Sequence, residues 1–486
     1  MIETLKLAPD FTISRVLTGL WQIADLERDG NVLDPAATAK HMVPYVDAGF
    51  TSFDMADHYG SAEIIAGYFR NHETSGSKAQ LLTKWVPKPG TVTMQDVRQA
   101  VQRSLERMKT DRLDMLQYHA WNYSDPAWLD SLFWLQELRE EGLIGHLGLT
   151  NFDAAHLRIA VASGIDILTN QVSYSLLDQR AAADDMAEVC RQYGVKLLAF
   201  GILAGGFLTE KWLGKAEPGA DQLITWSQMK YKRFIDASGG WSKLQGILQA
   251  LDAVARKYQV SMSTVSSRYM LDQPAVGGII LGARLGQGDH VKENMGIFNL
   301  SLDQQDRELI QQAVNNLDPI AGGCGDEYRT PPFLTATGDL SDHIDSIPPV
   351  FEPVADDSGK TRVFSGTAWE DFAGYCRAVR SGNRIRVSGT TATHGERLIG
   401  GKDPAAQTHY VIDKIQAAIE SLGGKLEDVD RTRIFVSDVS HWEAVARAHG
   451  ERFAHIQPAN TLVEAKLVGE DYLVEIEAEA CLTEPI

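Results

Sequence analysis

The sequence predicts an α/β protein in which a (β/α)8 barrel precedes a smaller α+β domain. The chain has 486 residues, which is too long for one ordinary domain. Short apolar, β-branched runs alternate with amphipathic helical stretches from about residue 15 to 315. Beyond about residue 318, a stretch rich in Gly, Pro and Asp leads into a different order of strands and helices.

Eight strand candidates carry the barrel prediction. Each is followed by helix-forming sequence, such as residues 94–109 and residues 127–142, where Gly142 suits a helix C-terminus. In a (β/α)8 (TIM) barrel, the active site lies at the carboxyl ends of the strands. The eight runs are residues 16–21, 50–56, 80–85, 113–119, 145–151, 166–172, 195–203 and 277–283.

The second domain is predicted to hold five strands and two helices. Its last strand, YLVEIEAEACL, alternates polar and apolar residues as a half-buried strand does. The expected division is a barrel over residues 1–318, a linker over 319–360 and the α+β domain over 361–486. The strands are expected at 361–366, 377–389, 430–439, 461–467 and 472–482, and the helices at 404–423 and 441–455.

Composition limits the classes of function. The formal net charge of −19 argues against nucleic-acid or anionic-membrane partners, which require a basic surface. The four cysteines form no C-x-x-C pair, and no His cluster has zinc-ligand spacing, so no metal is expected. The N-terminus has no apolar signal region, and no apolar run is long enough to span a membrane. These features predict a cytoplasmic protein with reduced thiols.

Three short motifs follow successive barrel strands. FDMADHYGSAE (53–63), TKW (83–85) and YHAW (118–121) resemble the signature of the aldo-keto reductase family, and the resemblance covers about residues 10–315. It implies that Tyr59 is the proton donor, Lys84 lowers the pKa of that tyrosine, Asp54 holds the lysine and His119 orients the carbonyl. These residue types suit carbonyl reduction, because the carbonyl oxygen needs a proton when the carbon accepts hydride. A free tyrosine gives up its proton reluctantly near neutral pH, and a neighbouring lysine cation lowers the pKa of the tyrosine. The alternative is that Asp54 and Lys84 form a structural ion pair.

The same resemblance implies a nicotinamide cofactor. GLTNF (148–152) and NQVSYSLL (170–177) are similar to the family's carboxamide-binding and stacking elements, and AFGILAGGFLT (199–209) and ILGARLGQGDHVKEN (280–294) to its phosphate- and adenosine-binding elements. Tyr174 is expected to stack on the nicotinamide, although it could instead be a core aromatic residue. Arg284 favours NADP(H), and NAD stays possible. The implied binding residues are Thr150, Asn151, Gln171, Tyr174, Gly201, Leu203, Gly282, Arg284, Glu293 and Asn294.

Three tryptophans lie near predicted strand ends. Trp21, Trp85 and Trp121 could form the wall of an apolar substrate pocket. The alternative is that they only pack around the rim of the barrel.

Residues 361–484 resemble the Rid/YjgF family, whose domains have a chorismate-mutase-like α+β fold. The matching segments are AGYCRAVRSGNRIRVSG, FVSDV, PANT and LVEIEAEA. The resemblance implies a homotrimer with clefts between subunits, where active members hydrolyse 2-imino acids. Tyr375 and Glu475 fall at family site positions, but Asn460 stands where an arginine would bind the substrate carboxylate. Glu475 could also be a strand residue at a subunit boundary.

The expected function is reduction of an aldehyde or ketone by NADPH, or the reverse oxidation of an alcohol. The Rid-like domain would serve in trimerisation or in handling an imine. Two alternatives stay open. The barrel could bind NADPH as a non-catalytic sensor or regulatory subunit, or the chain could be a bifunctional imine reductase and deaminase.

Overall fold

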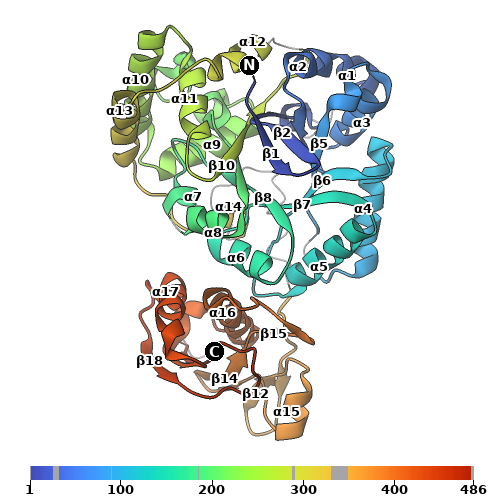
Figure 1. Ribbon diagram of the computed structural model, residues 1–486. Helices are drawn as coiled ribbons and strands as arrows, with labels where there is room; N and C mark the ends of the chain where they lie inside the picture. Colours follow the sequence, from blue (N-terminus) through green and yellow to red (C-terminus); the bar gives the residue numbers. More distant parts are fainter. Residues whose placement is uncertain are drawn as a thin grey trace. The chain divides into compact units, whose positions relative to one another are not determined.

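The computed structural model describes residues 2–25, 32–88, 90–183, 185–286, 290–329 and 348–482. These residues form two compact units (Figure 1). The first contains a closed barrel of eight parallel strands, and the second contains a seven-stranded sheet. Both parts of the predicted fold class are thereby confirmed.

Every predicted barrel strand is present, within a few residues of its expected bounds. In the closed sheet each strand pairs with the next, and the last strand pairs with the first. The barrel strands are β3 (Val16–Gly19), β4 (Ser52–Asp54), β5 (Gln80–Trp85), β6 (Leu113–Tyr118), β7 (Ile144–Thr150), β8 (Ile167–Ser173), β9 (Lys196–Phe200) and β10 (Val276–Gly282).

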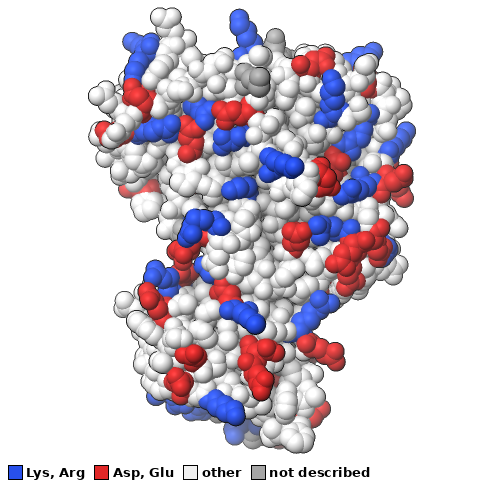
Figure 2. Space-filling model, in the orientation of Figure 1, with Lys and Arg blue, Asp and Glu red and all other residues white. Residues whose placement is uncertain are grey.

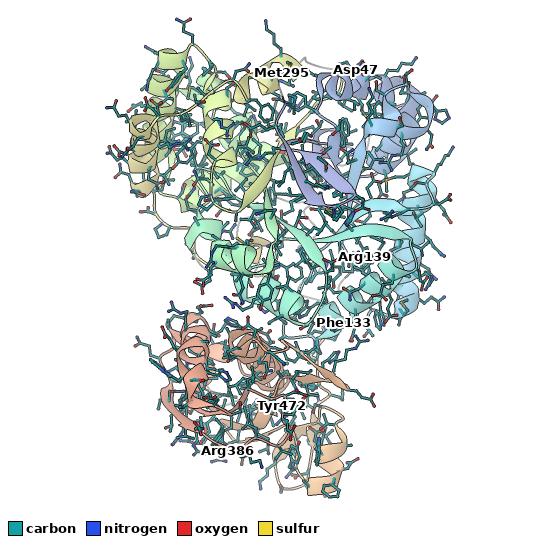
Figure 3. The ribbon with its side chains drawn as sticks, in the orientation of Figure 1. Asp47, Phe133, Arg139, Met295, Arg386 and Tyr472 are labelled. Atoms are coloured by element: carbon teal, nitrogen blue, oxygen red, sulfur yellow. The ribbon has the colours of Figure 1, made fainter. Side chains whose placement is uncertain are left out.

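Helices surround this barrel. Helix α4 begins where Thr93 and Asp96 form a reciprocal capping box, which satisfies backbone amides of the first turn. The helices α2 and α12 pack together, and Asp47 and Met295 mark them in Figure 3. The helices are α1 (Pro35–Ala39), α2 (Val43–Ala48), α3 (Ala62–His72), α4 (Met94–Met108), α5 (Ala127–Glu140), α6 (Ala154–Ala162), α7 (Arg180–Ala183), α8 (Met186–Tyr193), α9 (Trp226–Ala237), α10 (Trp241–Tyr258), α11 (Met262–Leu271), α12 (Val291–Ile297), α13 (Gln304–Asn315) and α14 (Asp326–Arg329).

An N-terminal hairpin closes one end of the barrel. Its strands β1 (Thr4–Ala8) and β2 (Phe11–Ser14) were not predicted from the sequence. Phe11 and Ile13 are buried in a cluster with side chains from five barrel strands: Leu17, Leu82, Met115, Leu198 and Ile280. Burial of this apolar surface stabilises the barrel at the end away from the strand mouths.

The second unit pairs a mixed sheet with two helices. The predicted strand 377–389 is a hairpin of two strands that turns at Gly382, where φ is +61°. Helix α16 begins at Asp403, whose side chain accepts a hydrogen bond from the amide of Ala406. Thr393 donates a hydrogen bond of 2.8 Å to the hydroxyl of Tyr472, which Figure 3 labels.

The bounds in this unit agree with the predicted strands and helices to within a few residues. A short helix, α15, and three short strands are additional. The elements are β11 (Val354–Ala355), β12 (Lys360–Val363), α15 (Ala368–Ala373), β13 (Ala378–Ser381), β14 (Arg384–Thr391), β15 (Thr393–His394), β16 (Arg397–Leu398), α16 (Pro404–Ser421), β17 (Val429–Val436), α17 (Trp442–Phe453), β18 (Ala459–Glu464) and β19 (Val474–Cys481).

The predicted linker, residues 319–360, is described at both ends, and its residues 348–360 belong to the second unit and include β11. Residues 320–329 belong to the barrel unit and include α14. Residues 330–347 lie outside the described part of the chain. Among the described residues, no helix is long and apolar enough to cross a membrane. Basic and acidic side chains are interspersed over the face drawn in Figure 2.

Candidate active site

The four residues of the expected acid-base tetrad meet at the mouth of the barrel. Asp54 ends β4, Lys84 lies in β5, His119 follows β6 and Tyr59 lies in the loop after β4. All four line one cavity of about 510 Å³. The sheet register brings Asp54 and Lys84 onto neighbouring strands, which explains how residues so far apart in sequence share one site.

Lys84 is a buried cation held by Asp54. Its Nζ donates to Oδ2 of Asp54 at 2.7 Å and to the carbonyl oxygen of Met55 at 2.8 Å. The same Nζ lies 5.4 Å from the centre of the Tyr59 ring. Burial lowers the pKa of Lys84, while Asp54 acts in the opposite direction and favours the charged form. Asp54 thus holds the Lys84 amino group close to the Tyr59 ring.

His119 lines the cavity as a neutral ring. Burial, together with the nearby Arg329, lowers the pKa of His119 to about 3. Its Nδ1 lies 3.4 Å from the carbonyl oxygen of Thr150 and 3.5 Å from Nδ2 of Asn151. Its Nε2 is buried and has no hydrogen-bond partner in the part of the chain that the structure describes. A ligand oxygen would satisfy this nitrogen.

Seven of the ten residues expected to bind a nicotinamide nucleotide line the cavity, together with a glycine-containing loop. Gly201, Gly205 and Gly206 have φ values of +80°, +63° and +90°, and they form an irregular loop at the cavity after β9. A Cβ on Gly201 would lie 2.6 Å from the hydroxyl of Tyr231, so only glycine allows this close packing. The expected residues that line the cavity are Thr150, Asn151, Gln171, Gly201, Leu203, Gly282 and Arg284.

Three residues that were expected to bind the cofactor do not line the cavity. Tyr174 is only 3% exposed and does not line the cavity, which corrects the expectation that it stacks on the nicotinamide. Phe200, the last residue of β9, lines the cavity instead. Glu293 and Asn294 also lie outside the cavity lining, and Glu293 accepts hydrogen bonds from the hydroxyls of Ser261 and Ser263. For Glu293, hydrogen bonds within the fold thus occupy the carboxylate that the motif assigned to the ligand.

Two of the three tryptophans line the cavity. The ring of Trp21 packs edge-on against Tyr59, with centroids 4.9 Å apart. Trp121 is fixed by a 2.6 Å hydrogen bond from its Nε1 to the carbonyl oxygen of Pro87. Trp85 is 5% exposed, packs against Tyr118 and does not line the cavity, so its expected role in the pocket is corrected.

Sequence reasoning missed several residues of the site. Gln117 donates a hydrogen bond of 3.1 Å to Asp54. A polar residue within an otherwise apolar strand could have indicated from the sequence that Gln117 belongs to the site. Lys230, from α9, and Tyr328, from α14, also line the cavity, and Lys230 donates a hydrogen bond to the Tyr328 hydroxyl. The sequence around Lys230 and Tyr328 carries no local signal for this placement, because the contact joins distant segments.

The C-terminal unit does not bring all three residues of the expected Rid cleft together. Glu475 pairs with Phe435 in the sheet, whereas Asn460 pairs with Thr432, so their side chains point to opposite faces. Asn460 donates a 2.9 Å hydrogen bond to Thr432, and burial raises the pKa of Glu475.

Arg377 lies near Tyr375 and the Glu475 carboxylate. Its guanidinium carbon is 6.0 Å from the centre of the Tyr375 ring, and its Nη2 donates to the carbonyl oxygen of Gly389 at 2.6 Å. A Cβ on Gly389 would lie 2.1 Å from a carboxylate oxygen of Glu475, so that carboxylate packs against the Gly389 backbone. A single chain therefore groups Tyr375 with Glu475 but not with Asn460.

A parallel barrel with a buried Asp–Lys pair, a tyrosine and a histidine at its mouth defines a barrel oxidoreductase. Residues 15–315 match the aldo/keto reductase family, and the chain belongs to that family. Residues 366–482 match the family described as endoribonuclease L-PSP, in agreement with the expected Rid/YjgF-like domain.

Individual relatives agree with this division. The NADH-specific methylglyoxal reductase of Escherichia coli is 24% identical over 64% of this chain and 97% of its own length. An uncharacterised protein of Streptomyces coelicolor is 39% identical over 24% of this chain and 90% of its own. The solved glycerol dehydrogenase of Gluconobacter oxydans shares the fold, with a TM-score of 0.53, 23% identity and coverage of 64% of this chain and 95% of that one.

Proposed function

We propose that the barrel catalyses NADPH-dependent reduction of an aldehyde or ketone, or the reverse oxidation of an alcohol. The observation that carries this proposal is the placement of Lys84 between Asp54 and Tyr59 in the wall of the cavity, with His119 lining the same space. An ion pair with a purely structural role would not need a tyrosine and an unsatisfied histidine nitrogen beside it.

The proposed roles follow from these contacts. Asp54 holds Lys84 in place, and the lysine charge favours the phenolate form of Tyr59. Tyr59 therefore donates its proton more easily to the substrate oxygen. Nε2 of His119 donates a hydrogen bond that orients this oxygen. A nicotinamide would supply the hydride when bound, and the cavity residues Thr150, Asn151 and Gln171 would hold its carboxamide while Phe200 would support the ring.

The preference for NADP(H) is part of the proposal. Arg284 is exposed at the edge of the cavity, and a guanidinium is well suited to bind a 2′-phosphate. NAD remains the second candidate, because one similar reductase is named as NADH-specific.

A direct assay tests the barrel function. Protein is mixed with NADPH or NADH and a panel of aldehydes, ketones and cyclic imines, and the loss of reduced-nicotinamide absorbance is followed. Turnover of aldehydes or ketones supports the proposal. Tight NADPH binding without turnover across the panel would favour a sensor, and turnover confined to the imines would favour an imine reductase.

For the C-terminal unit we propose assembly into a homotrimer, with imine handling as the second candidate. The strand β18 lies at the edge of its sheet, and Val463 on it is 43% exposed, so this edge is available to another subunit. Mass measurement of the full chain and of a variant lacking residues 346–486 tests the proposal. A truncated protein that remains trimeric would show that the domain does not drive assembly.

The proposed location is the cytoplasm. Within the part of the chain that the structure describes, no disulfide joins the four cysteines, in agreement with a reducing compartment. Thiol titration of the protein isolated under non-reducing conditions measures how many are free.

A further inference from the structure

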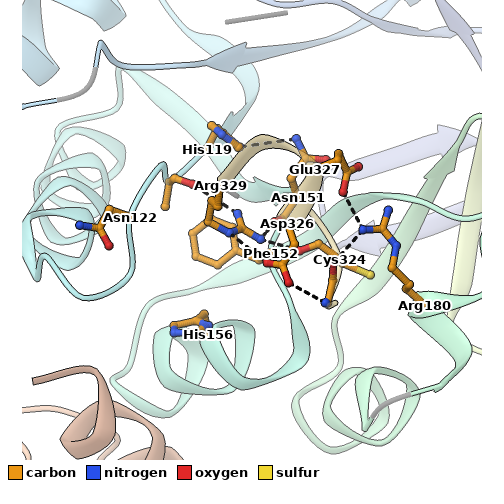
Figure 4. A network of polar contacts seen from close by, with 12 residues as sticks. His119, Asn122, Asn151, Phe152, His156, Arg180, Cys324, Asp326, Glu327 and Arg329 are labelled. Carbon is orange, nitrogen blue, oxygen red and sulfur yellow. Dashed lines mark hydrogen bonds and ion pairs between the residues drawn. The ribbon is translucent and has the colours of Figure 1, made fainter. Parts of the chain in front are cut away.

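Residues 320–329 fold over the mouth of the barrel, beyond residue 315, where the family match ends. A buried ion-pair group anchors this segment. Arg180 binds both carboxylate oxygens of Asp178, at 2.9 and 2.7 Å, and its Nη1 donates to Glu327 at 2.7 Å. All three side chains are at most 4% exposed. Figure 4 shows the Arg180–Glu327 contact beside the loops of the site.

The segment is shaped to fit closely against Asn151. Gly325 has a φ of +84°, and a Cβ there would lie 2.1 Å from the Asn151 carbonyl oxygen. The same carbonyl accepts a 2.9 Å hydrogen bond from Nη2 of Arg329, and Nη1 of Arg329 donates to the carbonyl of Ala120 at 3.3 Å. Arg329 therefore joins the loop after β6, which carries His119, to the loop after β7, which carries Asn151 (Figure 4).

Asn151 is the link from this arginine to the catalytic imidazole. It has a φ of +61°, an uncommon backbone conformation that the surrounding contacts must hold. Its Nδ2 lies 3.5 Å from Nδ1 of His119, whereas the Thr150 carbonyl lies 3.4 Å from the same nitrogen. When Asn151 donates to Nδ1, the imidazole proton is on Nε2. When Nδ1 donates to Thr150, Nε2 has no proton to give to a substrate oxygen.

We propose that Arg329 is a positioning residue of the barrel site, which holds Asn151 against His119 and thereby keeps the imidazole proton on Nε2. This inference rests on the proposed reductase function, because only a carbonyl substrate requires that proton. It also makes a segment outside the family match a necessary part of the active site. The guanidinium is suited to the role because its planar fork reaches two carbonyl groups at fixed angles.

The test compares Arg329→Lys, Arg329→Met and Gly325→Ala with the wild type in the full-length chain. Arg191→Met is the matched control, since Arg191 is 76% exposed and pairs only weakly, at 3.8 Å, with Glu188. Nitrogen NMR of histidine-labelled protein, with the His119 signals assigned through His119→Gln, reports which ring nitrogen carries the proton. Steady-state kinetics measures kcat/KM for each variant, and titration with NADPH measures its affinity for the cofactor.

We expect Nε2 to be protonated in the wild type and in Arg191→Met, and a measurable population with the proton on Nδ1 in all three test variants. The expected loss in kcat/KM is about 10- to 100-fold, the usual effect of a small misplacement at a site. NADPH binding should weaken several-fold, because Asn151 is one of its proposed contacts.

The inference is overturned if folded Arg329→Lys and Gly325→Ala keep the wild-type tautomer and a kcat/KM within twofold of the wild type. Arg329→Lys retains a cation and is the variant of choice if Arg329→Met does not fold. A wild type that turns over no carbonyl compound would instead refute the proposed function. In that case, the tautomer and the NADPH affinity still decide whether Arg329 positions Asn151.

Discussion

Gln171 donates a hydrogen bond of 2.7 Å from its Nε2 to Oδ1 of Asp54, the carboxylate whose other oxygen accepts from Lys84. Gln117 also donates to Oδ1, at 3.1 Å. The aspartate is thus held by two amides and one ammonium group, so its position does not depend on the lysine alone. Gln171 was expected to hold the cofactor carboxamide, and the contact that the structure shows is its hydrogen bond to the Asp54 carboxylate of the tetrad.

Replacing Asp54 by Asn should destabilise the protein strongly. Lys84 is 5% exposed, and the substitution would remove the carboxylate that pairs with its buried amino group. The free energy of unfolding should fall by about 3–5 kcal/mol, as for other broken buried pairs. Urea denaturation measures the change. Glu188→Gln, in an exposed pair, is the control, and an equally small effect for both variants would contradict the prediction.

Tyr59→Phe should remove turnover without removing cofactor binding. The substitution deletes only the hydroxyl that donates the proton, and the ring contacts with Trp21 remain possible. We expect kcat to fall about 10²- to 10⁴-fold, the usual contribution of a general acid. NADPH affinity, measured by fluorescence titration, should stay unchanged. Tyr68→Phe, on α3, serves as the control, and a Tyr59→Phe enzyme with wild-type kcat would remove Tyr59 from the mechanism.

His119 should make folding stability depend on pH. Burial lowers its pKa to about 3, while the unfolded chain has a value of about 6.5. At pH values between these two pKa values, His119 therefore carries a proton in the unfolded state but not in the folded state. The His119 contribution is fully present above pH 6.5 and is lost as the pH falls toward 3, by up to about 1.4 kcal/mol per pH unit.

Denaturation of wild type and His119→Gln at several pH values checks this prediction. The variant should lose stability less steeply between pH 6.5 and 4.5. Parallel pH dependences for the two proteins would show that His119 is not a buried neutral group. His72→Gln, which removes a histidine at an exposed site, is the control.

Arg284→Gln should change the choice of cofactor. Arg284 lies at the edge of the cavity, and its Nε is 3.4 Å from Oε1 of Gln22. Loss of an exposed guanidinium opposite a phosphate should raise the Kd for NADPH about fivefold. The Kd for NADH should change little, because NADH has no 2′-phosphate. Equal changes for both nucleotides would place Arg284 elsewhere in the site.

Much of the fold follows from local sequence. The eight barrel strands and the two longer helices of the second unit lie within a few residues of their predicted bounds, because hydrophobic periodicity reports burial directly. The hairpin β1–β2 was missed. Its strands are short, and only contact of Phe11 and Ile13 with the barrel interior explains their burial.

The candidate site was predictable where chemistry limits the residue type. Asp54, Tyr59, Lys84 and His119 stand out as polar residues at strand ends, and they do meet in one cavity. Tyr174 and Phe200 show the limit of such reasoning. Both are aromatic and both lie near a strand end, but the course of the chain after each strand decides which side chain lines the cavity.

The sequence by itself determined the order of the strands, the two domains and the four residues of the expected acid-base tetrad. The tertiary structure decided which residues surround them: Gln117 and Gln171 on Asp54, and Arg329 on Asn151. The physical reason is the range of the interactions. Strand and helix patterns arise from neighbours a few residues apart, whereas Arg329 reaches a carbonyl group 178 residues away along the chain.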